Sequence, residues 1–169
     1  MRWWWALLVV GLAACSSGAG QPPAERALPE SMAVSSPAFA AGGVMPRRFT
    51  CAGEDVSPPL AWSGVPAGTV EVAVVVDDPD APGGIFVQWV VAGIDPAATG
   101  LAAGALPPGA RQGRNSAGRA AWSGPCPPAG SSHHYRFTVY ALTRRADVGG
   151  AGAQAAVRRS RRPPAPGGG

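Results

Sequence analysis

Residues 77–84 read DDPDAPGG, and they follow the run VEVAVVV at residues 70–76. β-Branched residues at this density favour a buried strand, so residues 70–76 are predicted to form one. Proline donates no hydrogen bond to a sheet, and the prolines of the acidic stretch therefore predict that the strand ends in a turn. Asp78 and Asp80 flank the rigid Pro79, which would allow both carboxylates to point into one small space. A solvated Asp/Pro/Gly turn is the alternative interpretation of the same residues.

The N-terminus has the pattern of an export signal. A single arginine, Arg2, precedes an apolar run at residues 3–12, and small residues follow it. The run is too short to span a bilayer comfortably, so residues 1–14 are predicted to be a signal peptide. Residues 12–15 read LAAC and resemble the bacterial lipobox, in which the cysteine is lipidated; an ordinary cleaved signal peptide is the alternative. We therefore expect a protein of the bacterial cell envelope, anchored through lipidated Cys15 and facing the periplasm or extracytoplasmic space.

Composition divides the rest of the chain into a tether, a domain and a tail. Residues 15–30 are rich in Ser, Gly, Pro and Ala, which predicts a flexible tether. The following residues fit one domain by length, and we assign it to residues 31–142. Cys51 and Cys126 lie within this domain. An exported protein meets an oxidising compartment, where a disulfide between them is allowed.

The distribution of charge argues against a nucleic-acid-binding face. The formal net charge is +4, and every basic residue other than histidine is an arginine. Between residues 51 and 143, seven Asp and Glu residues outnumber four arginines, whereas residues 143–169 hold six arginines. The positive balance therefore comes mostly from the tail and not from the folded domain, and we expect no nucleic-acid partner.

The remaining patterns are those of an all-β protein. Residues 85–91 read IFVQWVV and predict a second strand, in which Gln88 is the one polar side chain. Residues 133–142 alternate apolar and polar side chains and predict another. Short strands, Pro/Gly loops and no long helical pattern together predict an antiparallel β-sandwich. His133 and Tyr135 would share one face of their strand, whereas the adjacent His133 and His134 would face opposite ways, so we expect no metal site and no cofactor.

Four blocks, taken together, resemble the phosphatidylethanolamine-binding family, specifically its bacterial Raf kinase inhibitor-like branch. Each block alone is a weak signal, but they occur in order and with ordinary spacing across residues 31–142. The blocks are FTCAGEDVSPPL at residues 49–60, DDPDAPGG at residues 77–84, GRNS at residues 113–116, and GPCPP at residues 124–128 with HHYRFTVY at residues 133–140.

The resemblance implies packed antiparallel sheets with a small anion pocket at one end. In the family this pocket takes phosphate-like groups and phosphoethanolamine headgroups. Its implied walls are Asp78, Asp80, Pro127, His133 and Tyr135. Imidazole and phenol groups can donate hydrogen bonds to a phosphate oxygen, and a carboxylate can receive an ammonium group. The resemblance also places Cys51 and Cys126 near the pocket mouth, which predicts that they form a disulfide.

The chain departs from the family pattern at two places. The family's second pocket histidine falls on Gln88, so Gln88 is a candidate ligand-binding residue that cannot titrate. Family members usually continue into a helix and a last strand, but residues 143–169 are rich in Arg, Pro and Gly and show neither an apolar stripe nor strand alternation. We predict that residues 143–169 are disordered and that this helix and strand are missing, through a shifted reading frame or a natural truncation.

These observations favour a binding module over an enzyme. The expected ligand is a phosphate-containing small molecule or a phospholipid headgroup, and the lipid anchor makes the membrane a second partner. A weak hydrolase is one alternative, but no activated nucleophile is visible, and Ser123 and Ser132 are only weak candidates. An inhibitor of a protease or kinase is another alternative, as some relatives are, although nothing in the sequence specifies such a protein partner.

Overall fold

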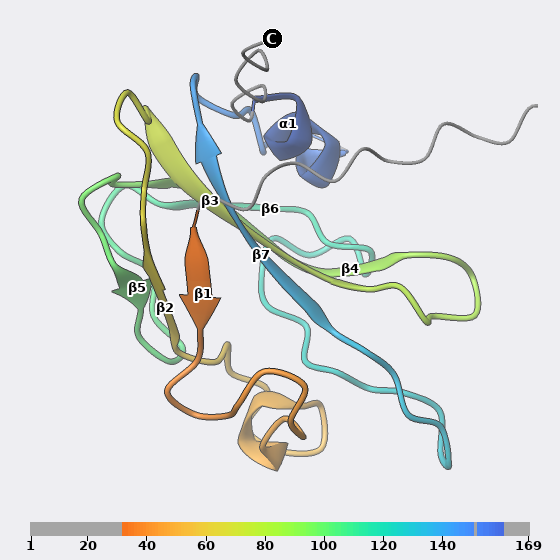
Figure 1. Cartoon of the computed structure of the whole chain (residues 1–169). Coiled ribbons are helices and arrows are strands. Elements are labelled where there is room, and N and C mark those ends of the chain that lie inside the picture. Colours follow the sequence, from red (N-terminus) through yellow and green to blue (C-terminus); the bar gives the residue numbers. More distant parts are fainter. Residues whose placement is uncertain (1–31, 151, 161–169) are drawn as a thin grey trace, which may run out of the picture.

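The computed structural model describes residues 32–150 and 152–160 (Figure 1). The predicted signal peptide, the lipidation of Cys15 and the tether lie outside these residues. None of the helices described there is long and apolar enough to cross a membrane. The elements, in chain order, are β1 (Ala33–Ser35), η1 (Arg47–Phe49), β2 (Leu60–Ser63), β3 (Glu71–Asp78), β4 (Phe86–Ile94), β5 (Gly100–Leu101), β6 (Arg111–Gly113), β7 (Arg136–Leu142) and α1 (Ala153–Ser160).

Strand β3 is the centre of the larger sheet, and all eight of its residues are buried. It pairs in antiparallel fashion with β4 on one side and β7 on the other, and β6 adds to the far edge of β4. Its apolar side chains alternate between two clusters: Val72, Val74 and Val76 face one, and Ala73 and Val75 face the other. The continuous apolar run is explained by this position, because both faces of the strand are covered.

The smaller sheet has the order β1-β2-β5 and is also antiparallel. It packs on one face of the larger sheet, and the core between them includes Leu60 and Trp62 from β2 and Trp89 from β4. Trp89 and Trp122 meet edge to face with ring centroids 5.7 Å apart. Two antiparallel sheets with little helix confirm the predicted all-β sandwich.

The strand ends differ from the prediction in ways that matter for the site. β3 continues through Asp77 and Asp78, which lie in the strand and not in the turn. β7 begins only at Arg136, so His133 and Tyr135 precede the strand instead of lying on it. The prediction that a strand spans residues 133–142 was therefore wrong for its first three residues.

The C-terminal prediction was also wrong for residues 143–150 and 152–160. Helix α1 is present, and its Ala153 and Val157 are buried with Ala146 and Val148 against the outer face of the larger sheet (Figure 1). The domain therefore extends beyond the predicted boundary at residue 142. Within the described residues no strand follows β7.

Two buried carboxylates hold this C-terminal segment in place. Asp77 accepts hydrogen bonds from the Arg136 guanidinium at 2.7 and 3.1 Å and from the Gln154 side chain of α1 at 2.9 Å. Glu71 accepts one from the Ala146 backbone N–H at 2.8 Å and another from the Arg111 guanidinium at 3.1 Å. Because these partners are far apart in the sequence, a local pattern search finds no signal for them.

Candidate functional site

The centre of the site is a buried carboxylate–imidazole pair. Asp78, the last residue of β3, accepts a hydrogen bond from Nδ1 of His133 at 2.8 Å, and the two side chains are only 5% and 8% exposed. The other Asp78 oxygen accepts the backbone N–H of Asp80 at 2.9 Å, which fixes the turn around Pro79. This arrangement fixes the orientation of the imidazole ring and leaves Nε2 of His133 as the nitrogen available to a ligand.

Tyr135 adds a second donor beside this pair. Its ring stacks on the His133 ring with centroids 6.5 Å apart and an interplanar angle of 26°. Its hydroxyl is buried and has no hydrogen-bond partner among the described residues. Burial, and then the charge of Asp78 together with the closeness of that carboxylate to the hydroxyl, raise the pKa of Tyr135 to about 12. The phenol therefore keeps its proton at ordinary pH and can donate a hydrogen bond to a ligand.

Asp80 forms a separate pair with His134 at the surface. Its carboxylate accepts hydrogen bonds from the backbone N–H and from Nδ1 of His134, each at 2.7 Å. These bonds, the backbone one above all, hold the pKa of Asp80 below its ordinary value. The expectation that Asp78 and Asp80 share one small space is thus corrected: each carboxylate binds its own histidine, one buried and one exposed.

Gln88 occupies an irregular position in β4. Pairing runs from Val76–Trp89 to Asp77–Val87, so Gln88 is an extra residue, a β-bulge, between these two pairs. The residue is 4% exposed, and its side-chain Oε1 has no hydrogen-bond partner in the part of the chain that the structure describes. Its side chain forms no hydrogen bond with the Asp78–His133 pair, and it is not among the residues that line the surface groove described below.

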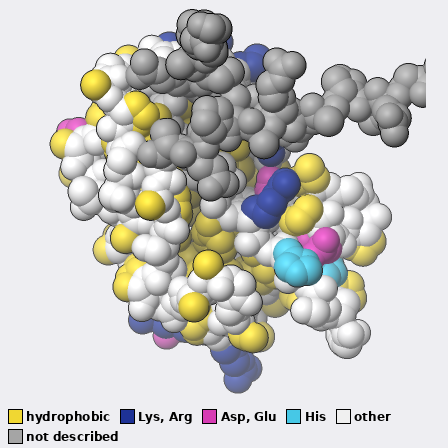
Figure 2. Space-filling view, viewed as in Figure 1, with side chains coloured by type: hydrophobic (Ala, Val, Ile, Leu, Met, Phe, Trp, Pro, Cys, Tyr) yellow, Lys and Arg dark blue, Asp and Glu magenta, His cyan; other side chains and the backbone are white. Residues whose placement is uncertain are grey.

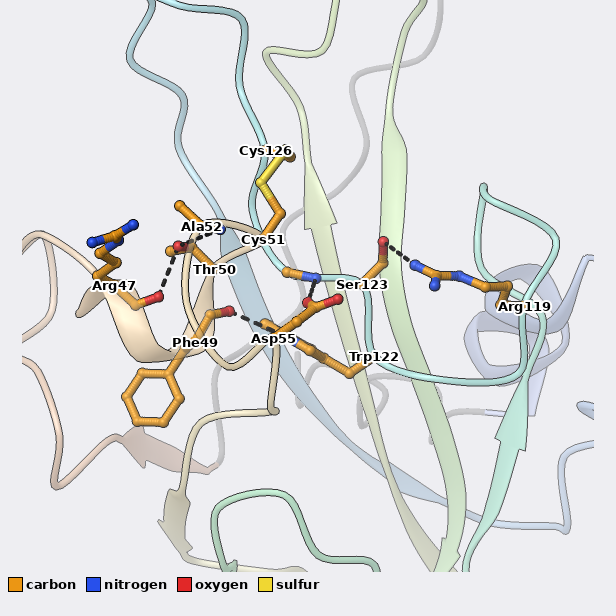
Figure 3. The surroundings of a disulfide bond; sticks show 11 residues. Arg47, Phe49, Thr50, Cys51, Ala52, Asp55, Arg119, Trp122, Ser123 and Cys126 are labelled. Carbon is orange, nitrogen blue, oxygen red and sulfur yellow. Dashed lines mark hydrogen bonds between the residues drawn. A yellow bond between two sulfur atoms is a disulfide. The ribbon is translucent and has the colours of Figure 1, made fainter.

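Pro127 lies on an exposed loop that is tied down by the Cys51–Cys126 disulfide (Figure 3). This is the pair of cysteines that the family resemblance predicts to be bonded, and their Cα atoms are 5.5 Å apart. The start of the loop is held by two further bonds: Asp55 accepts the Gly124 backbone N–H at 2.6 Å, and the Cys51 backbone N–H donates to the Pro125 carbonyl at 3.2 Å.

The site opens into a groove of about 890 Å³. Figure 2 shows hydrophobic side chains gathered in this hollow, with the histidines at its edge. Pro127, His133, His134 and Tyr135 line its polar end, whereas Asp78 lies behind them. Within residues 32–150 and 152–160, no three His, Cys, Asp or Glu side chains gather closely enough to hold a metal ion.

The arrangement suits anion binding better than covalent chemistry. The Tyr135 hydroxyl is a donor, and Nε2 of His133 becomes a second one when the ring is protonated; both lie beside a carboxylate that is already hydrogen-bonded. The candidate nucleophiles are placed differently: Ser123 accepts a hydrogen bond from the Arg119 guanidinium at 3.1 Å, and Ser132 is exposed on the groove wall. Among the described hydrogen bonds, none joins either serine to His133.

Sequence reasoning missed the role of His134. It placed the two histidines on opposite faces of a strand, whereas the chain at residues 131–135 is irregular and the Asp80–His134 pair lies beside the Asp78–His133 pair. The spacing Asp-x-Asp followed by His-His was a possible signal, because two adjacent acids and two adjacent histidines can pair in register.

Comparisons with known proteins give a consistent family. A family model described as phosphatidylethanolamine-binding protein matches residues 35–162. A Mycobacterium tuberculosis protein named "Putative lipoprotein LppC" is 46% identical in an alignment of 151 positions, which covers 80% of this chain and 75% of that protein. The crystal structure of E. coli YbcL matches with a TM-score of 0.71 and 37% identity, and covers 78% of this chain and 92% of its own. That of a phosphatidylethanolamine-binding protein homologue from Chlamydia trachomatis, CT736, has a TM-score of 0.69 and 33% identity, with coverages of 78% and 88%.

Proposed function

Because the chain belongs to the phosphatidylethanolamine-binding protein family, we propose that it binds a phosphate-containing small molecule or a phospholipid headgroup at the polar end of the groove. The observation that carries this proposal is the buried Asp78–His133 hydrogen bond with the buried Tyr135 hydroxyl beside it. A phosphate oxygen could accept from the Tyr135 hydroxyl and, when the His133 ring is protonated, from Nε2.

Asp80 supplies a second kind of contact in the proposed complex. It lies near the groove mouth with a side chain that is 40% exposed, and its lowered pKa keeps it ionised. An ionised carboxylate at that position attracts an ammonium group, so phosphoethanolamine, which carries both charges, fits the site better than phosphate alone.

We also propose a cellular location for the protein. The similarity to a protein named as a lipoprotein supports a lipid-anchored protein of the cell envelope. For this chain, lipidation at Cys15 would hold the domain at the extracytoplasmic surface of the membrane, within reach of lipid headgroups. We propose a binder and not an enzyme, because neither Ser123 nor Ser132 is hydrogen-bonded to His133 in the described part of the chain.

Titration calorimetry with inorganic phosphate and with phosphoethanolamine tests the proposal. A hydrogen bond to a charged group is worth about 1.5–3 kcal/mol, so His133→Ala should weaken the binding of both ligands by about tenfold or more. Arg48→Ala is the control: this exposed side chain does not line the groove, and its loss should change phosphate affinity by no more than about twofold. A His133→Ala protein that remains folded and binds as tightly as the wild type would remove His133 from the site.

A further inference from the structure

The end of the sandwich opposite the site is formed by three strand ends. Glu71 begins β3, whereas Asp78, the buried carboxylate of the site, ends it, so the two residues lie about 23 Å apart along the strand. Leu142, the last residue of β7, pairs with Glu71, and Ile94, the last residue of β4, pairs with Val72. We call the end marked by Glu71, Ile94 and Leu142 the tether end, because the chain enters the domain there.

β1 connects the tether end to the predicted tether. Ala33, the first residue of β1, pairs with Ser63, the last residue of β2. The neighbouring Trp62 donates its indole N–H to the carbonyl of Ala98, in the turn after β4, at 2.7 Å. In Figure 1 the arrow of β1 accordingly points away from the end where α1 lies. Residues 15–30, which are predicted to link the domain to lipidated Cys15, therefore lead to this end of the sandwich.

Exposed arginines gather at the same end. Arg144 and Arg145 closely follow β7, and Arg159 lies in the last turn of α1. The Arg144 guanidinium donates to the Arg159 carbonyl at 3.0 Å, and the Thr143 backbone N–H donates to the Ser160 carbonyl, also at 3.0 Å. The end of α1 is thus bonded to the end of β7, which places all three arginines together at the tether end.

The charge of the chain is divided unevenly between this end and the rest of the domain. Residues 32–142 hold six arginines and seven Asp and Glu residues, a formal balance of −1. Residues 143–169 hold six arginines and one acid, Asp147, a formal balance of +5. An anionic surface therefore attracts the tether end more strongly than the end that carries the site.

Two of these arginines are open to a partner. In the part of the chain that the structure describes, the side chains of Arg145 and Arg159 form no hydrogen bond and no ion pair, and both residues are exposed. Asp95 and Asp147 are exposed acids near the tether end, and they offset only part of its charge. Guanidinium groups that are exposed in this way can pair with phosphate oxygens.

We propose that the tether end is a docking surface for the anionic headgroups of the bilayer in which the chain is anchored, and that docking turns the site away from this bilayer. The inference rests on the lipid anchor proposed above and not on the ligand proposed for the groove. The 16 residues between Cys15 and Met32 would span about 20–25 Å if they are as flexible as their composition predicts. An anchor on so short a tether keeps the arginines at a high effective concentration near the headgroups, which attract basic residues. A ligand then reaches the groove from the extracytoplasmic space.

The test measures the orientation of the lipid-anchored full chain in nanodiscs whose lipids carry an acceptor fluorophore. One kind of disc contains phosphatidylcholine alone, and the other also contains phosphatidylglycerol. A donor fluorophore is attached, without reductant, at Val70→Cys beside the tether end or at Gly83→Cys in the turn after β3. Val70 is 48% exposed, Gly83 is exposed, and a Cβ atom at Gly83 meets no heavy atom within 4 Å.

In the anionic discs, the transfer efficiency from residue 70 should be at least twice that from residue 83. The difference should fall by at least half in the phosphatidylcholine discs, which lack the negative surface. It should fall equally in about 1 M salt, where the screening length is about 3 Å.

Two double variants assign the effect to the arginines. Arg145→Ala combined with Arg159→Ala should reduce the difference in transfer by at least half. Arg47→Ala combined with Arg48→Ala is the control: it removes the same charge from exposed positions of η1, which leads into the groove wall at Thr50, and should leave the difference unchanged. None of the four arginines lines the groove, so phosphate affinity in both variants should stay within about twofold of wild type, whether or not the orientation changes.

Four results would overturn the inference alone, while phosphate binding stays intact. Equal transfer from both positions in anionic discs would mean that the domain has no preferred orientation. Higher transfer from residue 83 would mean that the site faces the bilayer. An equal difference in neutral discs, or after loss of Arg145 and Arg159, would show that these charges do not orient the domain. Loss of the difference on addition of an equimolar RNA oligonucleotide would make a nucleic acid the better partner of the arginines.

The mass of the purified chain tests the anchor separately. A chain that carries no lipid on Cys15 would overturn the proposed location, and with it this inference. A lipidated chain without a preferred orientation would overturn this inference and leave the proposed location in place.

Discussion

The folded structure raises the pKa of the Tyr135 hydroxyl. Its pKa of about 12 lies above the ordinary value of about 10. In a Tyr140→Phe background, which leaves Tyr135 as the only tyrosine, tyrosinate absorbance should therefore rise near pH 12. Asp78→Asn should lower this pKa in part only, because burial is the larger cause. Ionisation at the ordinary value in the folded protein would contradict the buried placement of the hydroxyl.

The same shift predicts a pH dependence of stability. The folded protein holds the Tyr135 proton at pH values where the unfolded chain has lost it, so the unfolded state binds fewer protons between about pH 10 and pH 12. The contribution of Tyr135 to stability is therefore complete below about pH 10 and is lost as pH rises toward 12. Tyr135→Phe should reduce this loss in denaturant unfolding curves recorded across that interval.

Gln88 is the position at which the sequence resemblance predicts a departure from the family pattern, and its Oε1 is buried without a partner among the described residues. One interpretation is that Gln88 serves only to satisfy buried polar groups between the sheets, but an unsatisfied oxygen does not fit that role. If its side chain reaches the ligand, Gln88→His adds a titratable donor. Phosphate binding should then tighten and should rise more steeply as pH falls through about 6.5, the reference pKa of histidine. Calorimetry at one pH value on each side of 6.5 compares the two proteins, and a well-folded variant that binds no better would exclude Gln88 from the site.

Individual residues also show what sequence could and could not predict at the site. Asp78, His133 and Tyr135 were identified by resemblance to a family, and they lie together. Asp77 was placed in the same acidic turn, yet it lies in β3 and binds Arg136 and α1 instead. The difference depends on where the strand ends and on which face each side chain points toward. Both features are determined by the pairing of β3 with β4 and β7. These strands are distant in the sequence, so a short motif does not specify the pairing.

At the scale of elements, α1 should contribute measurably to stability. Val157 is fully buried against the larger sheet, and Val157→Ala removes two buried methyl groups and leaves a cavity. The expected loss is about 2 kcal/mol, from about 0.8 kcal/mol for each buried carbon plus the cavity cost. Val44→Ala is the matched control, since Val44 is 93% exposed and the same change there should stay within about 0.5 kcal/mol. Urea unfolding measures both, and an unchanged midpoint for Val157→Ala would show that α1 is not docked in solution.

The contrast between β3 and α1 explains why one element was predicted and the other was not. β3 can be predicted from local sequence, because a run of β-branched residues strongly favours a buried strand. α1 is eight residues long and buries Ala153 and Val157, small side chains that form a weak apolar stripe. A helix this short is marginal alone and depends on tertiary contacts. Its contacts with Asp77 come from a strand more than seventy residues earlier, so local sequence gave no sign of the helix.

At the scale of the whole molecule, the disulfide adds a covalent link between two loops that hydrogen bonds already join. Cys51 and Cys126 are 75 residues apart, and the segment between them contains β2 to β6. On the chain-entropy model, closing a loop of this length destabilises the unfolded state by about 4 kcal/mol. Replacing both cysteines with serine should lower the free energy of unfolding by a similar amount. Alkylation of the native oxidised protein, followed by mass measurement, should find no free thiol at either position.

The disulfide should affect ligand binding as well as stability, because it sits between the fold and the site. Cys126 directly precedes Pro127 on the groove rim, and Cys51 follows the segment whose Phe49 carbonyl accepts the Trp122 indole N–H at 3.2 Å. Other bonds also hold this loop, among them the one from Gly124 to Asp55, so the double-serine variant should keep the Asp78–His133 pair and lose only the fixed position of the rim. Phosphate needs only the buried donors, so its affinity for the folded variant should stay within about threefold of the wild-type value. A larger headgroup that contacts the rim should lose more affinity than phosphate does. Equal losses for both ligands would mean that the disulfide positions the buried pair itself, and the site would then depend on the oxidation state of the whole molecule.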